Sequence, residues 1–228
     1  YLYDLNLNGF RFSGLQTLVI NANIQQRVLR LMFSGLASLT FGGFVSTEWI
    51  DLTNVNSGPS VIFSQDISAP GEFSSMIFTM PKFGKPQAIY FNGANGANNS
   101  VTLQRSIGRT DTFSIKAQKL VGTVEFEANT VLNPGSFPTV TPTLGSIGGA
   151  DFSNSLITSI RGPGLNCSAA NSGINLTNCN NLNTATLNKF YEDLAVNNFG
   201  SPLILTGVAA AASSNYIIAQ SKGWLVIL

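Results

Sequence analysis

Histidine is absent from the sequence, and its absence excludes several kinds of chemistry. None of the 228 residues is histidine, so the commonest general base, the commonest zinc ligand and every Ser-His or Cys-His catalytic pair are missing. No glycine-rich run continues into the Lys-Ser/Thr of a phosphate-binding loop, and no acidic residues follow the spacing of an EF-hand. We therefore expect a protein that is not an enzyme, with no catalytic residue, no cofactor and no metal site.

Charged residues are also scarce. Asp, Glu, Lys and Arg make up 10% of the chain, against about 25% in an average soluble domain. Twelve basic and eleven acidic residues leave a net charge of +1, and like charges are not clustered, so we expect neither nucleic acid nor an anionic membrane as a partner. The polar residues are mainly Asn, Ser, Thr and Gly, a profile typical of a virion or extracellular surface.

Long apolar runs are missing as well. No stretch reaches about eighteen uninterrupted apolar residues, so no membrane-spanning helix is expected. The first residue is Tyr1, and neither an initiator Met nor a signal peptide precedes the first apolar pattern. A processed chain and a piece of a longer protein both fit this beginning.

Two cysteines and three glycosylation sequons are candidates for covalent modification. Cys167 and Cys179 lie twelve positions apart. At the repeat spacing described next they would sit one repeat apart and could stack close enough for a disulfide, but Cys is also a common small buried residue at such places, and two buried free thiols are the interpretation that we favour. The sequons are at Asn98, Asn166 and Asn175, in stretches that favour exposed turns, although an Asn-, Ser- and Thr-rich chain also contains such motifs by chance.

A short phrase recurs through residues 1–130: two apolar residues one position apart, followed by a polar or glycine turn. From Leu5 to Val124, ten steps cover 119 residues, which averages about twelve residues a step. The pairs are Leu5 and Leu7, Leu18 and Ile20, Leu31 and Phe33, Leu39 and Phe41, Ile50 and Leu52, Val61 and Phe63, Met76 and Phe78, Ile89 and Phe91, Val101 and Leu103, Phe113 and Ile115, and Val124 and Phe126. Alternation with a period of two indicates strands.

The repeated phrases closely resemble one another, and this resemblance indicates which β architecture the chain adopts. Short strands at regular spacing favour a sandwich, a barrel or a solenoid. Because every phrase carries its apolar pair at the same point relative to the turn, we expect each strand to lie directly on an earlier one. The prediction is a mainly β chain, a leucine-rich-repeat-like β-solenoid with two strands in a coil of about 24 residues. The recurring phenylalanines are expected to stack in its core.

The pattern divides the chain into four parts and predicts a C-terminal α/β cap. The parts are 1–130 with the solenoid repeats, 131–153 as a Pro/Gly-rich loop or linker, 154–182 with the last irregular coils, and 183–228 as the capping module. In the last part the period changes to about 3.6, which indicates an amphipathic helix capped by Asn183 or Thr184.

A strand, a helix and a strand follow that first helix. Residues 203–205 are expected to form a strand, Ser213 or Ser214 to cap a second helix, and Trp224 to begin a final strand parallel to the first. We expect Trp224 in the core of the cap, with carbohydrate stacking as the alternative for Trp224 and Trp49.

Two segments carry a resemblance to known proteins. Residues 2–7 read L-x-x-L-x-L, which resembles the strand phrase of leucine-rich repeats. The end of the chain resembles a module at the C-termini of leucine-rich or β-solenoid proteins of tailed-phage fibres and baseplates, and of some bacterial surface proteins. The matching residues are Leu187, Leu194, 203–207, 209–212 and 222–224. The apolar end at 225–228 and the lack of proline in the Ala-rich turn depart from that module.

The resemblance implies a virion structural protein, a phage tail, baseplate or capsid fibre component for display or host attachment. An extracellular filament subunit or a bacterial surface adhesin is the alternative, and a polysaccharide-degrading spike is the second alternative. A solenoid leaves an open strand edge at each end. No cap precedes Leu2, so we expect this edge to meet a second copy, another virion or filament subunit, or an upstream segment of a longer chain. Cell-surface glycan is a further candidate partner.

The enzymatic alternative depends on one pair of carboxylates. Glu125 and Glu127 lie two positions apart and therefore on one face of a strand, where two carboxylates can act as acid and base in glycan cleavage. Asp111 on a neighbouring phrase could join them. The interpretation that we favour is a solvated face opposite the inward Val124 and Phe126.

Overall fold

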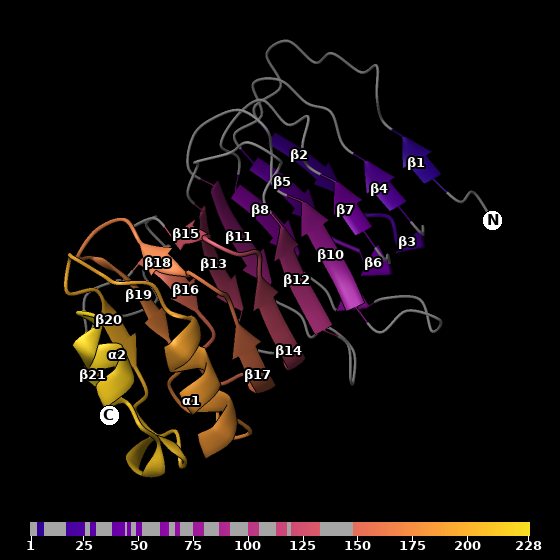
Figure 1. The fold of residues 1–228 in the computed structure, drawn as a ribbon. Helices are drawn as coiled ribbons and strands as arrows, with labels where there is room; N and C mark the ends of the chain where they lie inside the picture. Colours follow the sequence, from indigo (N-terminus) through magenta and orange to yellow (C-terminus); the bar gives the residue numbers. More distant parts are fainter. Residues whose placement is uncertain are drawn as a thin grey trace.

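The protein is mainly β, with few helices and no closed barrel among its described residues (Figure 1). The structure is a computed structural model. It describes residues 4–6, 17–25, 28–30, 38–43, 45–46, 49–51, 60–63, 67–68, 75–79, 87–91, 100–104, 113–117, 120–132 and 148–228. No helix within these ranges is long and apolar enough to span a membrane.

The strands form three sheets of seven, eleven and three strands. The first sheet contains β1 (Asp4–Asn6), β4 (Val28–Arg30), β7 (Trp49–Asp51), β10 (Ser75–Thr79), β12 (Ser100–Gln104), β14 (Val121–Phe126) and β17 (Leu156–Arg161). The second contains β2 (Thr17–Ile20), β5 (Ser38–Phe41), β8 (Ser60–Phe63), β11 (Gln87–Phe91), β13 (Phe113–Ala117), β15 (Val131–Leu132), β16 (Gly148–Asp151), β18 (Asn166–Cys167), β19 (Ser172–Asn175), β20 (Pro202–Ile204) and β21 (Leu225–Ile227). The third contains β3 (Ile24–Gln25), β6 (Val45–Ser46) and β9 (Ile67–Ser68).

Every pairing between the named strands is parallel. Most pairs join residues 19 to 29 positions apart, such as Val28 with Trp49, twenty-one positions on, which lies around the expected repeat of about 24 residues. The pairs that span residues 133–147, such as Ile115 with Ala150, are 35 or 36 positions apart and therefore depart from that repeat. Because all of these pairings are parallel, the described strands do not form the sandwich of antiparallel hairpins that regular short strands also allow.

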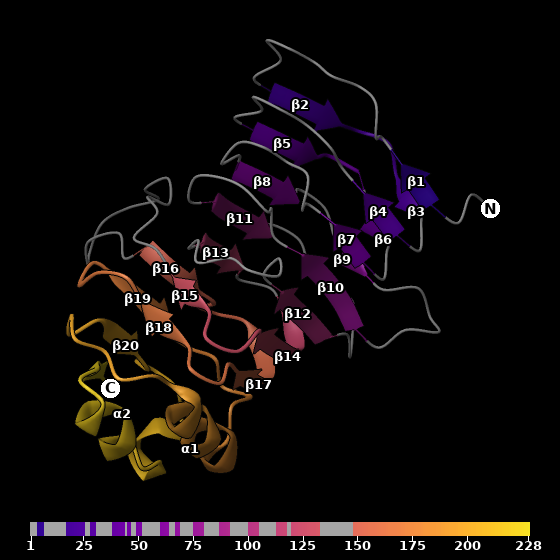
Figure 2. The ribbon, with the colours of Figure 1, turned by 45° about the horizontal axis from the view of Figure 1, so that its top comes forward.

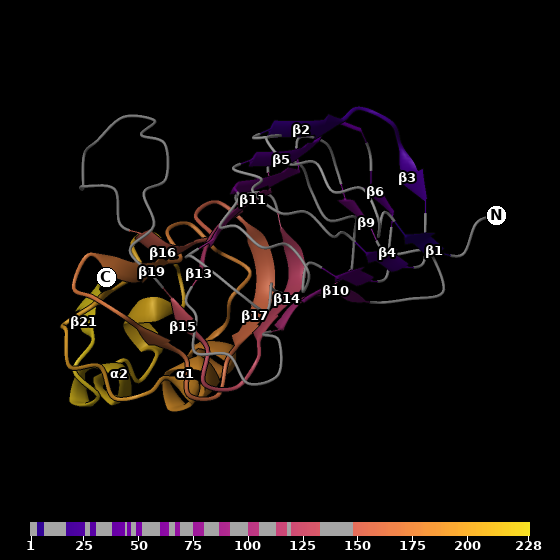
Figure 3. The same cartoon turned by 90° about the horizontal axis from the view of Figure 1, so that it is seen from above.

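Apolar columns run through both large sheets, as the repeated phrase predicts. In the second sheet the paired residues are Leu18, Leu39, Val61, Ile89, Ile115, Ala150, Ile174, Leu203 and Val226. In the first sheet they are Leu5, Leu29, Ile50, Phe78, Leu103 and Phe126. The two sheets lie on opposite sides of the stack when it is seen from above (Figure 3).

The columns contribute to one hydrophobic core. Phe41 and Val124 are fully buried and Phe126 nearly so, which confirms the expected inward face of these phrases. Phe126 meets Phe152 edge to face, with 6.2 Å between the ring centroids, a favourable aromatic geometry. The other phenylalanines expected in the core, Phe33, Phe63, Phe78, Phe91 and Phe113, have side chains outside the described part.

Two features of the strands were not expected. The third sheet adds a short third strand to each of the first repeats, where the phrase pattern predicts two. The predicted loop at 131–153 begins with strand β15 and ends with strand β16 and the buried Phe152. Two-residue strands such as β3 and β15 are too short to show an alternating pattern. Residues 133–147 lie outside the described part, and the four-part division of the chain stays a prediction.

The first helix, α1 (Thr184–Asp193), begins at the expected cap. Asn183 Oδ1 accepts a hydrogen bond from the Thr186 backbone N–H at 2.9 Å, and Thr186 Oγ1 accepts one from the Asn183 N–H at 3.0 Å. This reciprocal pair satisfies donors that a helix N-terminus otherwise leaves open. The buried residues Leu187 and Phe190 confirm the expected apolar face.

The second helix, α2 (Ile217–Ser221), does not begin as predicted. Its N-cap is Tyr216, without a side-chain hydrogen bond, and a short 3₁₀ helix, η1 (Ala211–Ser213), precedes it. The Ser214 hydroxyl donates to the Ala211 carbonyl at 2.7 Å instead, so the expected cap at Ser213 or Ser214 is wrong. Short-range Ser-to-backbone bonds of this kind compete with capping.

A helix takes the place of the next strand at the end of only one of the two large sheets. Helix α1 lies against β17, the last strand of the first sheet, and occupies the place of its next strand (Figure 2). Its C-terminal end keeps backbone pairing with the preceding layer, through Ala195 N–H to Leu165 O at 2.9 Å. The second sheet continues to β20 and β21, which are parallel as predicted. The expected cap therefore covers one sheet and leaves the other with a strand at its end.

A methyl group at Gly149 should destabilise the stack. Gly149 has φ +107, and an added Cβ would collide with the carbonyl oxygen of Gly173 in the paired strand. We expect Gly149→Ala to lower the free energy of unfolding by about 3 kcal/mol in denaturant titrations. Gly200→Ala is the control because Gly200 has φ +66 and an added Cβ meets nothing within 4 Å. It should lose only about 1 kcal/mol, and equal losses would contradict the packing argument.

Candidate functional site

The predicted carboxylate pair does not form an isolated acidic site. Glu125 lies exposed on β14 and is paired in register with Arg161 of β17. Glu127 follows the end of β14 and is half-buried, and Asp111 lies outside the described residues. Glu125 therefore has a cation beside it on the next strand. Within the described ranges no three His, Cys, Asp or Glu side chains gather as metal ligands.

The two cysteines are buried free thiols in the structure, as the favoured interpretation expects, and the possible disulfide between them is not formed. Cys167 is in β18, where its partner in the preceding repeat is Leu132. Cys179 follows β19, and its Sγ donates to the Phe152 carbonyl at 3.1 Å. The cysteines thus belong to different columns of the stack, although twelve residues separate them. Burial raises the pKa of both thiols to about 12.

The described sequon asparagines lie in strands, where exposed turns were expected. Asn166 and Asn175 belong to β18 and β19 and are half-buried, and Asn98 lies outside the described residues. Asn166 Nδ2 donates to the Val196 carbonyl, and Asn175 Nδ2 donates to Asp151 Oδ1, each at 3.1 Å. Glycosylation at the three positions stays a prediction.

Asparagine and aspartate side chains join successive layers, a feature that the sequence analysis missed. Asn175 Nδ2 bonds Asp151 Oδ1, and each of the two side chains also accepts from the backbone N–H two residues on. Asn178 Nδ2 bonds Asn154 Oδ1 at 2.9 Å. Each pair is separated by 24 positions, so a search for Asn or Asp at the repeat length would have found them.

Asn197 is the most completely bonded of these side chains. It is 3% exposed. Its Oδ1 accepts from the Phe199 and Ser201 N–H groups at 3.0 Å, and its Nδ2 donates to Asn166 Oδ1 at 2.9 Å and Ser201 Oγ at 3.0 Å. Two donors and two acceptors are the capacity of one amide. Because a buried polar group without partners is costly, Asn197 fixes the loop between α1 and β20 in one geometry.

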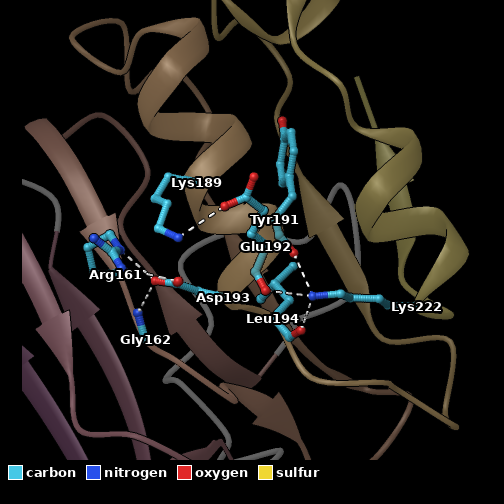
Figure 4. Close-up of polar contacts among 8 residues, drawn as sticks. All are labelled: Arg161, Gly162, Lys189, Tyr191, Glu192, Asp193, Leu194 and Lys222. Atoms are coloured by element: carbon cyan, nitrogen blue, oxygen red, sulfur yellow. Dashed lines mark hydrogen bonds and ion pairs between the residues drawn. The ribbon is translucent and has the colours of Figure 1, made fainter.

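An ion pair joins the last strand of the first sheet to α1 (Figure 4). Arg161 Nε lies 2.5 Å from Asp193 Oδ2, and its Nη2 lies 3.2 Å from Oδ1. The Gly162 N–H also donates to Oδ2 at 3.1 Å, and Asp193 is buried. The hydrogen bond to Asp193 raises the pKa of the Arg161 guanidinium. A bidentate contact of this kind is directional, and here it attaches the helix to the sheet.

A lysine joins α1 to the layer that follows. Lys222, at the end of α2, donates from Nζ to the carbonyl oxygens of Tyr191 at 3.1 Å, Glu192 at 2.7 Å and Leu194 at 2.6 Å (Figure 4). These carbonyls belong to the C-terminal end of α1, which carries partial negative charge and unsatisfied acceptors. The ammonium satisfies three of them and links the two helices.

The tryptophan at the end of the chain belongs to the core. Trp224 is 3% exposed, and its Nε1 donates to the Ala195 carbonyl at 3.0 Å. The expected core position is confirmed, and a carbohydrate platform at this residue is excluded by its burial. The side chain of Trp49 lies outside those that the structure describes.

The polar groups around α1 form hydrogen bonds and an ion pair with one another. The donors and acceptors named above are paired between layers, and this arrangement fixes the helices onto the strands. Comparison of the chain with protein-family models, with curated proteins and with solved structures found no match. The geometry supports a structural role for this junction.

Removing the Asp193 carboxylate should weaken the junction. Asp193→Ala leaves Arg161 and the Gly162 N–H without their partner, so we expect a loss of about 2 kcal/mol in the free energy of unfolding. Glu192→Ala is the control because it removes an exposed ion pair with Lys189, which contributes less than about 0.5 kcal/mol, and a weaker charge interaction with Arg161 while leaving the Asp193 carboxylate in place. Equal losses would show that the Arg161 contact contributes nothing.

The buried thiols should make stability fall in alkali. In the unfolded chain a thiol ionises at its ordinary pKa of 9.0, whereas the folded pKa is about 12. Their contribution is complete below pH 9 and is lost as the pH rises toward 12. The double variant Cys167→Ala, Cys179→Ala should lose less stability than the natural chain over this range. Parallel curves of unfolding free energy against pH would contradict this.

Proposed function

We propose that the chain is a leucine-rich-repeat-like β-solenoid and a non-enzymatic structural protein of a virion. Its role would be rigid display or host attachment as a tail, baseplate or capsid fibre component. The observation that carries the proposal is the apolar column of the second sheet from Leu18 to Val226, in which each residue is paired in parallel with the one below. A stack of this kind keeps one direction and one cross-section along its length.

The contacts between layers support a rigid body. The side chains of Asn175 and Asn178 each bond the layer below, and the Arg161–Asp193 pair fixes the first helix. Such contacts resist sliding of one layer over the next, because a shift would break the side-chain hydrogen bonds between layers and would leave the buried Asp193 without its partners. Rigidity along one axis is what a fibre or baseplate component needs.

The polar surface favours a role in binding partner molecules over a role in catalysis. Glu125 has Arg161 beside it in the paired strand, so the two-carboxylate geometry of a glycan-cleaving spike is not favoured. We propose the same partners as the sequence analysis does: a second copy or other virion or filament subunits at the N-terminal edge, and cell-surface glycan. An extracellular filament or surface adhesin is the second proposal, favoured by the exposed apolar residues Val19 and Leu225 at the two ends of the second sheet.

Negative-stain microscopy of native material with a labelled antibody should place the protein on virions. A glycan-release assay should detect no activity with either the natural chain or Glu127→Gln. Antibody along free helical filaments would support the second proposal instead. Glycan release that is lost in Glu127→Gln, while folding by circular dichroism is kept, would overturn the non-enzymatic proposal.

A further inference from the structure

The last strand of the second sheet has an open edge. On one side β21 bonds β20, through Leu225 N–H to Ser201 O at 3.0 Å and Ile227 O to Leu205 N–H at 2.7 Å. Alternate residues of a strand point their backbone groups to opposite sides, so the N–H and C=O of Val226 face away from β20. In the part of the chain that the structure describes, no strand pairs with β21 on that side.

The outer edge of β21 lacks charged side chains and proline, although helix α2 packs against this strand. Proteins protect edges with lysine, proline, bulges or a covering helix. Residues 224–228 contain no charge and no proline, and the preceding Lys222 directs its ammonium onto carbonyls of α1. The first sheet differs, because α1 lies against its last strand β17. Among the described residues, α1 occupies the place of the next strand of the first sheet, whereas no strand pairs with the outer edge of β21.

The opposite end of the same sheet offers a matching edge. Strand β2 pairs with β5 alone among the described strands, and residues 17–23 are also uncharged. The outward residues at the two ends are apolar and exposed, 51% for Val19 and 57% for Leu225. The inward residues Leu18 and Val226 are partly buried against the core. Each edge thus presents the end of an apolar column. A further strand with the same alternation of inward and outward apolar residues would continue that column.

We propose that the β21 edge of one copy pairs in parallel with the β2 edge of a second copy, head to tail. The inward column would then continue from Val226 of one copy to the Leu18 column of the next, and the backbone groups of Val226 would gain partners. The two edges are different, so the contact is heterologous and open, and it adds copies along one axis. This inference rests on the proposed solenoid and names the edge that self-association uses.

Lysine substitutions on the two edges test the proposal. Leu225→Lys and Val19→Lys place a charge where a new strand would desolvate it. In mass photometry or sedimentation the natural chain should form a concentration-dependent series of multimers, and each variant should be monomeric. Leu156→Lys is the matched control, since Leu156 is 54% exposed at the start of β17. It should assemble like the natural chain.

Mixing the two variants tests the polarity of the contact. Val19→Lys keeps an intact β21 edge and Leu225→Lys keeps an intact β2 edge, so an equal mixture should form dimers and nothing larger. Val226→Pro is a second variant, which removes the outward N–H and leaves the bonds to β20. It should lose assembly like Leu225→Lys while its circular dichroism is unchanged.

Several outcomes would overturn the inference. A natural chain that stays monomeric at all concentrations, edge variants that assemble as well as Leu156→Lys, or a mixture without dimers would each do so. Dimers of the natural chain alone, lost in Leu225→Lys and unaffected by Val19→Lys, would show β21-to-β21 pairing instead. A monomer that microscopy still finds on virions would keep the proposed function and overturn only this contact.

Discussion

Parallel pairing of each strand with the strand one repeat earlier is the constraint on which the rest of the structure depends. Because the pairing keeps its register, Leu18 and every residue of its column down to Val226 lie one above another. A column of apolar side chains then excludes water without a conventional core of packed layers, and its length is set by the number of repeats. The low fraction of charged residues fits this construction, since each repeat has an inward face to fill.

The same register explains the polar residues. A hydrogen bond between side chains of successive layers forms only where the two residues have the same place in the repeat, as Asp151 with Asn175 and Asn154 with Asn178 do. Asparagine suits these places because one amide both donates and accepts, so it can bond the layers above and below. The abundance of Asn, read from the composition as a sign of a surface location, thus also has a structural cause.

The two ends of the stack differ in what they can contact. At the C-terminal end the strands of the first sheet give way to α1 and α2, fixed by Asp193 and Lys222, while the second sheet continues as a strand. Helices in place of strands prevent further pairing on one side only. The two ends of the described second sheet are therefore both strands, β2 and β21, whereas the first sheet ends at a helix.

The sequence alone predicted a mainly β chain, the apolar face of α1 with its Asn183 cap, and the core position of Trp224, because each depends on side-chain periodicity or local chemistry. It did not predict the short strands β3, β6, β9, β15 and β16, nor the pairing steps of 35 and 36 residues across residues 133–147. It could not determine which columns face each other. The possible disulfide between Cys167 and Cys179 was left open for this reason: the structure places these two cysteines, twelve residues apart, in different columns. The Arg161–Asp193 pair spans 32 positions, and only the tertiary structure, by replacing a strand with a helix, brings these two charges together.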